Sequence, residues 1–333
     1  MSELRKDPIL DRWVIISTDK EEVDLSQFCL QEPETRRGGF CPFCYGNEDK
    51  TPPEISAIRD EGTRANTAGW QVRVVPNKFP ALMIEGDLSP TGIGLFDMMN
   101  GIGAHEVIIE NPSHDRGISD YTPEEAKRVI KVYRERKLDL KKDGRLEYIL
   151  IFKNHGLKAG ASLEHSHSQL IALPCVPIRV EEELAGARRH FEYKERCIFC
   201  DILRQEQDFE KRIILENEDF ISFAPFVPRF PFETWILPKR HRCHFFEIEE
   251  KEENSLSEIL PCTLNRLKKL LNDPPYNYII HTSPLKQEEE EYYHWHLEIM
   301  PQLARVGGFE WGTGFFLNPV SPEQAARQLK EVG

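Results

Sequence analysis

The first feature of the chain that could perform chemistry is a pair of histidines, His165 and His167, separated by Ser166. Apolar runs at 148–152 and 170–173 lie on either side of the pair, and such runs predict buried strands. Residues i and i+2 of a strand share a face, so the two rings face the same way. A buried imidazole needs partners for its ring nitrogens. The pair therefore indicates metal binding, or nucleophilic or acid–base chemistry, and two hydrogen-bonded strand histidines are the alternative.

The spacing of the cysteines favours a metal. Four of the eight cysteines form two Cys-x-x-Cys pairs, Cys41 with Cys44 and Cys197 with Cys200. The first pair lies in a loop rich in glycine, proline and asparagine, which is typical of a zinc knuckle rather than of a redox-active helix start. The other four cysteines are isolated in the sequence, and we assign them no role.

The second half of the chain repeats the first in outline. Residues 233–241 match residues 106–114 in length, apolar strand, proline and final histidine, and a second His-x-His motif follows another apolar strand. Each half thus supplies the four ligands that a structural zinc ion takes in a tetrahedron. The repeat predicts two zinc sites: Cys41, Cys44, His114 and His165 in the first, and Cys197, Cys200, His241 and His294 in the second.

If zinc takes His165, then His167 stays free. An imidazole that is held on a metal-anchored strand and is not itself ligated can act as a nucleophile. Ser162, Gln169 and the backbone amides near Gly160 supply neutral donors of the kind that hold a phosphoryl group. The zinc would be structural, because protein ligands fill its four positions. The alternative for His167 is a fifth ligand or a partner of the ligands.

Length and charge narrow the class of protein. The 333 residues suffice for two domains, and we place the division after residue 185, which gives segments 1–185 and 186–333. The 43 basic and 56 acidic side chains give a net charge of −13, which argues against nucleic acid or an anionic membrane as a partner. The first residues lack the apolar core of a signal peptide, and no apolar run is long enough to span a bilayer. A cytoplasmic enzyme is the expected class.

Local signals predict the elements that position these residues. A capping box with proline at the first helical position opens a helix at Thr122, and apolar spacing extends that helix to about Leu140. Further helices are expected over 181–190, over 256–267 and after Ser321. Strands are expected within 11–17, 72–75, 106–114, 148–152 and 276–280, and loops in the glycine-rich stretches 92–103 and 307–314.

Taken together, these motifs resemble the galactose-1-phosphate uridylyltransferase family of the histidine triad superfamily, over nearly the whole chain. The matching residues are Asp7-Pro8, Trp13-Val14-Ile15, Cys41 and Cys44, Asn111-Pro112 with His114, and the stretch from Asn154 through Gly160 and Ser162 to Gln169. The resemblance implies an α+β fold of two tandem histidine-triad-like halves, with antiparallel sheets flanked by helices, and a homodimer.

The resemblance also implies a ping-pong nucleotidyl transfer. His167 would attack the α-phosphorus of a nucleotide sugar, release the sugar 1-phosphate and carry the nucleoside monophosphate until a phosphorylated acceptor removes it. The family's phosphate contacts carry over to Ser162 and Gln169, with Asn154 nearby, and its nucleoside pocket carries over to Asn77 and Phe79.

The chain departs from the family pattern at several positions. His165-Ser166-His167 replaces the usual His-Pro-His, and this form, with residues 272–278 and 307–319, resembles the branch that contains ADP-glucose phosphorylase. The family has a basic pair near the nucleotide phosphates after the first strand, and this chain has Ser-Thr-Asp-Lys-Glu-Glu there, at residues 17–22. Arg36 or Arg37 could substitute for that pair. The C-terminal segment lacks the lysine and the Tyr-Glu pair that read the hexose in the galactose enzymes.

Another departure concerns the second metal. Some family members hold iron with one glutamate and three histidines, and Glu183, His281, His294 and His296 match that set. The cysteine site competes with this set for His294. We favour the cysteine site, because thiolates bind zinc more strongly than a carboxylate does.

The sequence therefore predicts a nucleotidylyltransferase, in its simplest form a UDP-glucose:hexose-1-phosphate (galactose-1-phosphate) uridylyltransferase. ADP-glucose phosphorylase, in which inorganic phosphate is the acceptor, is the alternative within the family. Two alternatives come from other classes. A histidine-triad hydrolase would pass the nucleotide to water, and a non-catalytic zinc protein would bind nucleotides or a partner without turnover.

Overall fold

The structure is a computed structural model that describes residues 2–18, 25, 28, 39–287 and 290–333. Arg36 and Arg37, which the sequence analysis offered as phosphate contacts, lie outside the described residues. Within the described part of the chain, no helix is long and apolar enough to cross a membrane.

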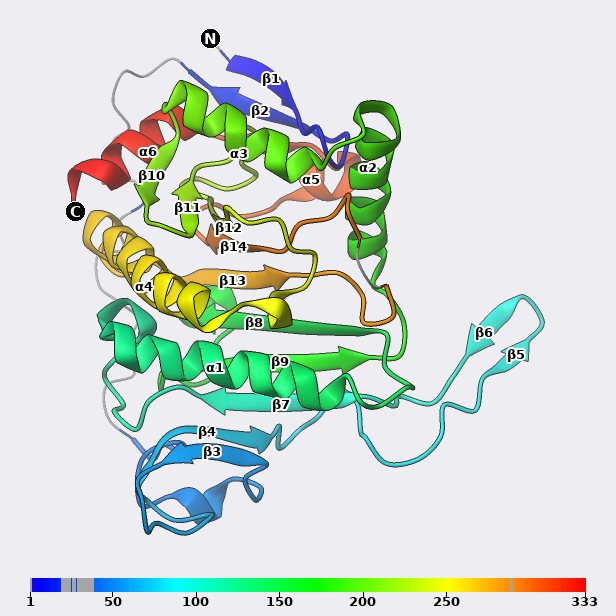
Figure 1. The fold of residues 1–333 in the computed structure, drawn as a ribbon, viewed down its shortest axis with the longest axis vertical. Helices are drawn as coiled ribbons and strands as arrows, with labels where there is room; N and C mark the ends of the chain where they lie inside the picture. Colours follow the sequence, from blue (N-terminus) through cyan, green and yellow to red (C-terminus); the bar gives the residue numbers. More distant parts are fainter. Residues whose placement is uncertain (1, 19–24, 26–27, 29–38, 288–289) are drawn as a thin grey trace.

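Ten strands of the described chain form one antiparallel sheet, in the order β10-β11-β12-β14-β13-β8-β9-β7-β4-β3 (Figure 1). The first half of the chain supplies five of them: β3 (Ser56–Arg59), β4 (Trp70–Pro76), β7 (Ala104–Ile109), β8 (Tyr148–His155) and β9 (His167–Leu173). The second half supplies the others: β10 (Ile213–Glu216), β11 (Phe220–Phe223), β12 (Thr234–Pro238), β13 (Tyr276–His281) and β14 (His296–Pro301).

The strand order shows the internal repeat directly. Strands β13, β14, β12, β11 and β10 follow one another outward from the centre as β8, β9, β7, β4 and β3 do on the other side. The two halves meet where β8 pairs with β13, from Ile151 opposite Ile280 to His155 opposite Tyr276. This seam joins the two predicted sheets into one. The predicted division after residue 185 falls within α2 and stays a prediction.

Helices cover both faces of the sheet. On one face, α1 (Pro123–Leu140) and α4 (Glu250–Leu271) lie side by side across the strands, and α6 (Pro322–Glu331) packs beside α4 (Figure 1). They bury the large core to which α1 contributes Val129 and Ile130 and α4 contributes Leu260 and Leu264. On the other face, α2 (Ile178–Lys194) and α3 (Ile198–Phe209) bury a second core. The predicted α+β class, with antiparallel pairing and flanking helices, is confirmed.

The remaining elements are short. Strands β1 (Ser2–Lys6), β2 (Trp13–Ser17) and β15 (Phe316–Asn318) form a separate small sheet. Four 3-10 turns are described: η2 (Glu48–Lys50), η3 (Ile118–Asp120), η4 (Leu157–Ala159) and η5 (Phe245–Glu247). The predicted capping box is present, because the Thr122 hydroxyl accepts from the Glu125 amide and the Glu125 carboxylate accepts from the Thr122 amide.

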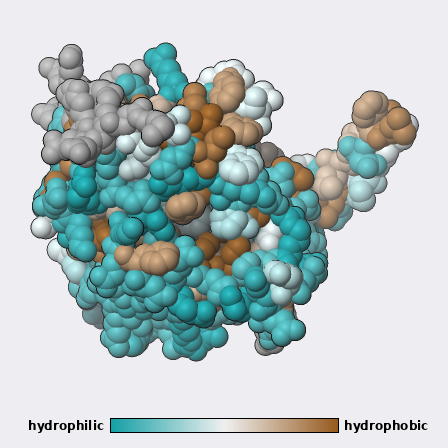
Figure 2. All heavy atoms as spheres, turned by 90° about the horizontal axis from the view of Figure 1, so that it is seen from above, coloured by the Kyte–Doolittle hydropathy of each residue, from teal (hydrophilic) through white to brown (hydrophobic). Residues whose placement is uncertain are grey.

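The sequence analysis expected the two glycine-rich stretches to be loops. In the structure, both contain regular elements. The first contains a hairpin of β5 (Thr91–Ile93) and β6 (Phe96–Met98), because Gly94 at φ 62 allows a tight turn. This arm extends from the body with an apolar tip (Figure 2), where Leu95 is 97% exposed. The second contains a short helix, α5 (Gly308–Thr313), whose Glu310 carboxylate accepts from the Gly307 amide. In both stretches the local hydrogen bonds, rather than the glycine content, set the structure.

Helix α2 packs against the N-terminal segment through Gly186. A Cβ built on Gly186 would lie 1.8 Å from the carbonyl oxygen of Ile9, so no side chain fits between helix and segment. Helix propensity alone favours alanine over glycine by about 1 kcal/mol, but an overlap with backbone atoms outweighs that gain.

We therefore expect Gly186→Ala to lower the melting temperature. Gly312→Ala in α5 is the matched control, because nothing lies within 4 Å of a Cβ at that position. Propensity then predicts an unchanged or slightly raised melting temperature for the control. Thermal unfolding followed by circular dichroism measures both. A Gly186→Ala protein as stable as the control would contradict the described packing of α2.

Candidate active site

The four predicted ligands of the first metal site meet in the structure. Cys41 and Cys44 come from the turn before η2, His114 follows β7, and His165 precedes β9. The Cys44 sulfur lies 3.3 Å from Nδ1 of His114 and 3.5 Å from Nδ1 of His165, and the Cys41 sulfur lies 3.8 Å from Nδ1 of His165. Ligands placed tetrahedrally at zinc distances lie roughly 3.3–3.8 Å apart. The donor set and its spacing therefore fit one zinc ion.

A hydrogen bond at the other ring nitrogen fixes the orientation of the His165 ring. Its Nε2 lies 2.7 Å from the carbonyl oxygen of Asn111 and donates to it. Nδ1 is then the unprotonated nitrogen, and it faces the two thiols. A ligand histidine whose other nitrogen is held by a carbonyl is the usual arrangement in protein zinc sites.

His167 begins β9 and lies next to this cluster without belonging to it. Its Nδ1 donates to the carbonyl oxygen of His165 at 2.8 Å, which leaves Nε2 as the ring nitrogen with the lone pair. Phe43, between the two cysteines, contacts the ring edge to face at 5.3 Å. Burial lowers the pKa of His167, so the ring is neutral near neutral pH. A neutral imidazole with one fixed nitrogen is a competent nucleophile.

Gln169, two residues further along β9, shares the face of His167. His105 of β7 holds it: the Ala81 amide donates to Nδ1 of His105 at 3.2 Å, so Nε2 carries the proton and donates to Oε1 of Gln169 at 2.8 Å. The Gln169 amide nitrogen is then the group that remains to donate to a ligand. Asn77 lies beside this pair, with its Nδ2 3.5 Å from the Gln169 oxygen. Sequence reasoning missed His105, because its partner is 64 residues away.

The loop between β8 and β9 carries the other predicted phosphate contacts. Gly160 takes a left-handed conformation at φ 91, and its carbonyl oxygen lies 3.5 Å from Nδ2 of Asn154. Asn277 of β13 donates to Oδ1 of Asn154 at 2.7 Å and to the carbonyl oxygen of Ala159 at 2.8 Å. The second half of the chain thus holds a loop of the first half. Asn277 was missed as a contact, although it lies in the stretch that marked the branch.

Two of the predicted substrate contacts, Ser162 and Phe79, are exposed on the surface. Ser162 is exposed in the loop before His165. Phe79 is 82% exposed, although its amide donates to Oδ1 of Asn77 at 2.9 Å. The structure therefore brings Asn77 to the neighbourhood of Gln169 but packs no other described side chain over most of the Phe79 ring.

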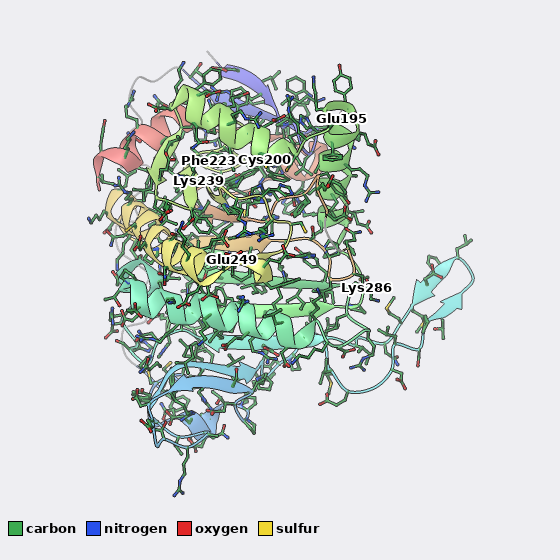
Figure 3. The ribbon with its side chains drawn as sticks, viewed as in Figure 1. Glu195, Cys200, Phe223, Lys239, Glu249 and Lys286 are labelled. Atoms are coloured by element: carbon green, nitrogen blue, oxygen red, sulfur yellow. The ribbon has the colours of Figure 1, made fainter. Side chains whose placement is uncertain are left out.

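The four predicted ligands of the second metal site also meet in the structure. Cys197 and Cys200 lie at the start of α3 (Cys200 is labelled in Figure 3). His241 follows β12, and His294 precedes β14. The Cys200 sulfur lies 3.4 Å from Nδ1 of His241 and 3.6 Å from Nδ1 of His294. These separations again fit a tetrahedral zinc ion.

The alternative set of one glutamate and three histidines is divided in the structure. His294 belongs to the cysteine cluster, as the sequence analysis favoured, and Glu183, His281 and His296 form a separate group. His296 repeats the geometry of His167, because its Nδ1 lies 3.1 Å from the His294 carbonyl oxygen. Its Nε2, however, lies 3.3 Å from the Glu183 carboxylate, and the His281 ring stacks on it at 4.4 Å. In the second half of the chain, the Nε2 atom of His296, the counterpart of His167, is therefore already occupied by a side chain of the protein.

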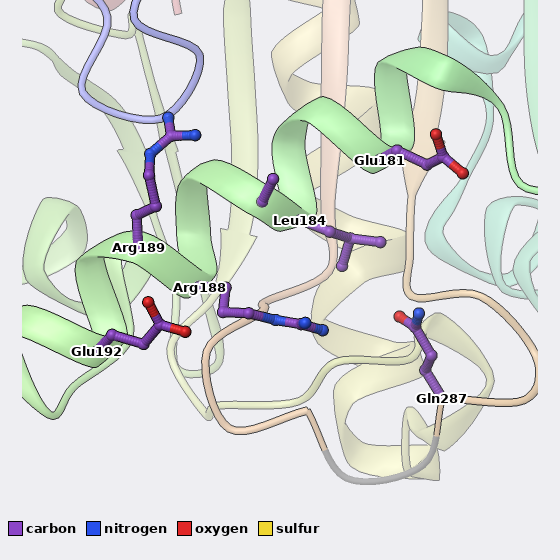
Figure 4. A pocket seen from close by; sticks show the side chains of 7 residues that line it. Glu181, Leu184, Arg188, Arg189, Glu192 and Gln287 are labelled. Carbon is purple, nitrogen blue, oxygen red and sulfur yellow. The ribbon is translucent and has the colours of Figure 1, made fainter.

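A hollow elsewhere on the surface lies along α2 (Figure 4). It is lined by Glu181, Leu184, Ala185, Arg188, Arg189, Glu192 and Gln287. Among the described residues, none of the predicted ligands or phosphate contacts lines it. The hollow is therefore separate from the site around His167.

Two family descriptions match most of the chain. The galactose-1-phosphate uridyl transferase N-terminal domain matches residues 45–177, and the C-terminal domain of the same family matches residues 183–333. Together these matches include every predicted ligand and phosphate residue except Arg36, Arg37, Cys41 and Cys44.

Known proteins resemble the chain along its whole length. An ADP-glucose phosphorylase of Arabidopsis thaliana is 40% identical, over 99% of this chain and 93% of its own. A galactose-1-phosphate uridylyltransferase of Thermotoga maritima is 31% identical, over 100% of this chain and 99% of its own. A crystal structure of an Arabidopsis thaliana ADP-glucose phosphorylase with bound ADP-glucose superimposes with a TM-score of 0.83 at 38% identity, covering 100% of this chain and 99% of that one.

Each Cys/His cluster should bind one zinc ion that depends on its own thiolates. We expect two zinc ions per chain, and one after either Cys44→Ser or Cys200→Ser, because a hydroxyl is a much weaker zinc ligand than a thiolate. Cys262→Ser is the matched control, since Cys262 is an exposed cysteine on α4. Metal analysis of the purified proteins gives the count. Two zinc ions retained by Cys44→Ser would contradict the first site.

Proposed function

The chain belongs to the galactose-1-phosphate uridyl transferase family of nucleotidyltransferases, and we propose that it acts as an ADP-glucose phosphorylase. In this reaction an adenylyl group passes from ADP-glucose to inorganic phosphate by way of His167. The observation that carries the proposal is the His167 ring, whose Nδ1 is tied to a backbone carbonyl so that Nε2 is left to react. The choice of adenylyl transfer is supported by the 40% identity to a phosphorylase, against 31% to a uridylyltransferase.

The reaction proceeds in two displacements. In the first, the lone pair of His167 Nε2 forms a bond to the α-phosphorus of ADP-glucose, the bond from that phosphorus to the bridging oxygen breaks, and glucose 1-phosphate leaves with the electron pair. In the second, an oxygen of inorganic phosphate attacks the same phosphorus, the nitrogen–phosphorus bond breaks, and ADP leaves. The sum of the two steps converts ADP-glucose and phosphate into ADP and glucose 1-phosphate.

The side chains around His167 have distinct parts in this scheme. The Gln169 amide nitrogen donates to an oxygen of the α-phosphoryl group, because His105 occupies the oxygen end of that amide. Asn154 and Gly160 shape the loop that approaches the phosphates, and Asn77 and Phe79 contact the nucleoside. With Cys41, Cys44 and His114, His165 would hold a zinc ion and so fix the strand that presents His167. Such an ion would be structural and would supply no reacting oxygen, since protein ligands would fill its four positions.

Uridylyl transfer from UDP-glucose to a hexose 1-phosphate, which the sequence analysis put first, is now the second candidate. The full-length similarity to the Thermotoga maritima uridylyltransferase favours it. Both reactions use the same His167 and differ in the base and in the acceptor. Assembly as a homodimer stays a prediction in either case.

Intact-protein mass spectrometry after mixing with ADP-glucose, without an acceptor, tests the proposal. We expect an adenylyl adduct on the wild-type chain and on His190→Ala, a matched control at a histidine of α2, and none on His167→Ala. Adding phosphate should then discharge the adduct as ADP.

Other outcomes would point elsewhere. An adduct formed from UDP-glucose but not from ADP-glucose would contradict the proposal and favour the uridylyltransferase function. Release of AMP into water without phosphate would indicate the hydrolase. An adenylyl adduct that persists in His167→Ala would exclude His167 as the nucleophile.

A further inference from the structure

A charged pair lies buried directly behind the nucleophile strand. Ser166, between the two histidines, faces away from the metal cluster, and its hydroxyl donates to the Glu110 carboxylate at 2.7 Å. Lys153 of β8 donates to the same carboxylate at 2.6 Å and to the Ser166 oxygen at 2.9 Å. Its third hydrogen bond, at 3.0 Å, goes to the carbonyl oxygen of His167. The Lys153 side chain is 1% exposed and that of Glu110 is fully buried.

Neighbouring hydroxyls complete the network on the side of α1. The Tyr133 hydroxyl lies 3.1 Å from the other Glu110 oxygen, 2.7 Å from the Ser168 hydroxyl and 2.6 Å from the Tyr278 hydroxyl. Every member of this network is buried. All three donor positions of the Lys153 ammonium are therefore used, and the group has one fixed position.

Stability alone does not account for such a pair. Removing two charges from water costs several kcal/mol each, and apolar side chains of similar volume often serve as well or better. The internal repeat contains that apolar solution. Trp295 stands where Ser166 does, between two histidines, and packs edge to face against Phe220 and Phe245.

The counterpart of Lys153 is apolar as well. Strand β13 pairs Ile280 with Leu297, the residue after His296, and strand β8 pairs Phe152 with Gln169, two residues after His167. Lys153, the next residue of β8, thus corresponds to Ile280, which is 2% exposed. The charged pair lies behind the free histidine and is absent behind the histidine that Glu183 closes off.

We propose that Lys153, oriented by Glu110, is a positioning residue that holds the backbone of His167 so that Nε2 lies in line with the α-phosphorus. Two carbonyl groups fix the His167 residue. The carbonyl oxygen of His165 accepts from Nδ1 of the ring, and the carbonyl oxygen of His167 itself accepts from the Lys153 ammonium. A nucleophile must be placed within about 0.5 Å of its reactive position, and a displacement of about 1 Å can cost 10²-fold in rate. This proposal rests on the proposed nucleophilic role of His167.

The test separates positioning from stability by a double variant. Lys153→Met alone leaves the Glu110 carboxylate buried without its cation, so it should lower the melting temperature. Adding Glu110→Gln removes that charge and keeps an acceptor for Ser166, so the double variant should recover most of the melting temperature. Lys137→Met is the matched control, because Lys137 is an equally buried lysine whose ammonium lies 5.9 Å from the centre of the Phe246 ring.

The readout is the single-turnover rate constant for adduct formation from saturating ADP-glucose. We expect the double variant to lose about 10- to 100-fold in this rate constant. The donor concentration at half saturation and the zinc content should stay within twofold of wild type, and Lys137→Met should keep the wild-type rate. A stable, zinc-loaded double variant with the wild-type rate constant would overturn the proposal. If the double variant does not fold, Lys153→Met alone, measured below its melting temperature, carries the same test with the same two outcomes, because it removes the bond to the His167 carbonyl.

A second readout covers the case in which the wild-type chain forms no adduct with any nucleotide sugar, which would count against the proposed function. Nitrogen-15 NMR of the resting protein reports the Nδ1 proton of His167. We expect a slowly exchanging resonance in the wild type and a shifted or exchange-broadened one in the double variant. Identical His167 signals in the two proteins would contradict positioning by Lys153, whatever the reaction.

Discussion

The alternation of side chains through three residues of one extended segment is the constraint on which the site depends. His165 and His167 face the loop that carries Cys41 and Cys44, and Ser166 faces the opposite side of the sheet. One histidine can therefore serve a metal and the next the substrate, while the residue between them is anchored from behind. A shift of one residue in the register of β9 would exchange these faces and abolish both functions at once. The sheet around β9 fixes that register, because β7 and β8 pair with it on either side.

The internal repeat shows how one arrangement has been given two roles. Both halves place a phenylalanine of the Cys-x-x-Cys motif against their two histidines, Phe43 in the first half and Phe199 in the second. Both tie the second histidine to the carbonyl group of the first. Only in the first half is Nε2 left for a ligand, whereas Glu183 and His281 occupy that space in the second. The second half instead supports the first, through Asn277 and the seam between β8 and β13.

Much of this could be predicted from the sequence, because the informative signals are local. The proline and capping box at Thr122 fixed the start of α1, and two spaced cysteine pairs with repeated His-x-His motifs predicted both ligand clusters. The missing parts depend on contacts between distant residues. His105 reaches Gln169, Asn277 reaches the loop at Ala159, and Glu110 meets Lys153, and none of these pairs has a characteristic spacing. The prediction of loops in the glycine-rich stretches was wrong, because composition does not reveal a hairpin or a short capped helix. The comparisons support the ADP-glucose alternative better than the uridylyl reaction that the sequence analysis put first, and no local motif reports the shape of a nucleoside pocket.

The central claim is that a metal-held His165 presents His167 for covalent transfer. Native mass spectrometry of the Cys200→Ser protein after mixing with ADP-glucose tests it directly, because the one zinc ion expected in that variant lies in the first site, and metal and adduct are read on the same molecule. The account predicts that the adenylyl adduct appears only on chains that retain zinc. An adduct of equal yield on metal-free chains would contradict it, since His167 would then react without the strand that the metal fixes.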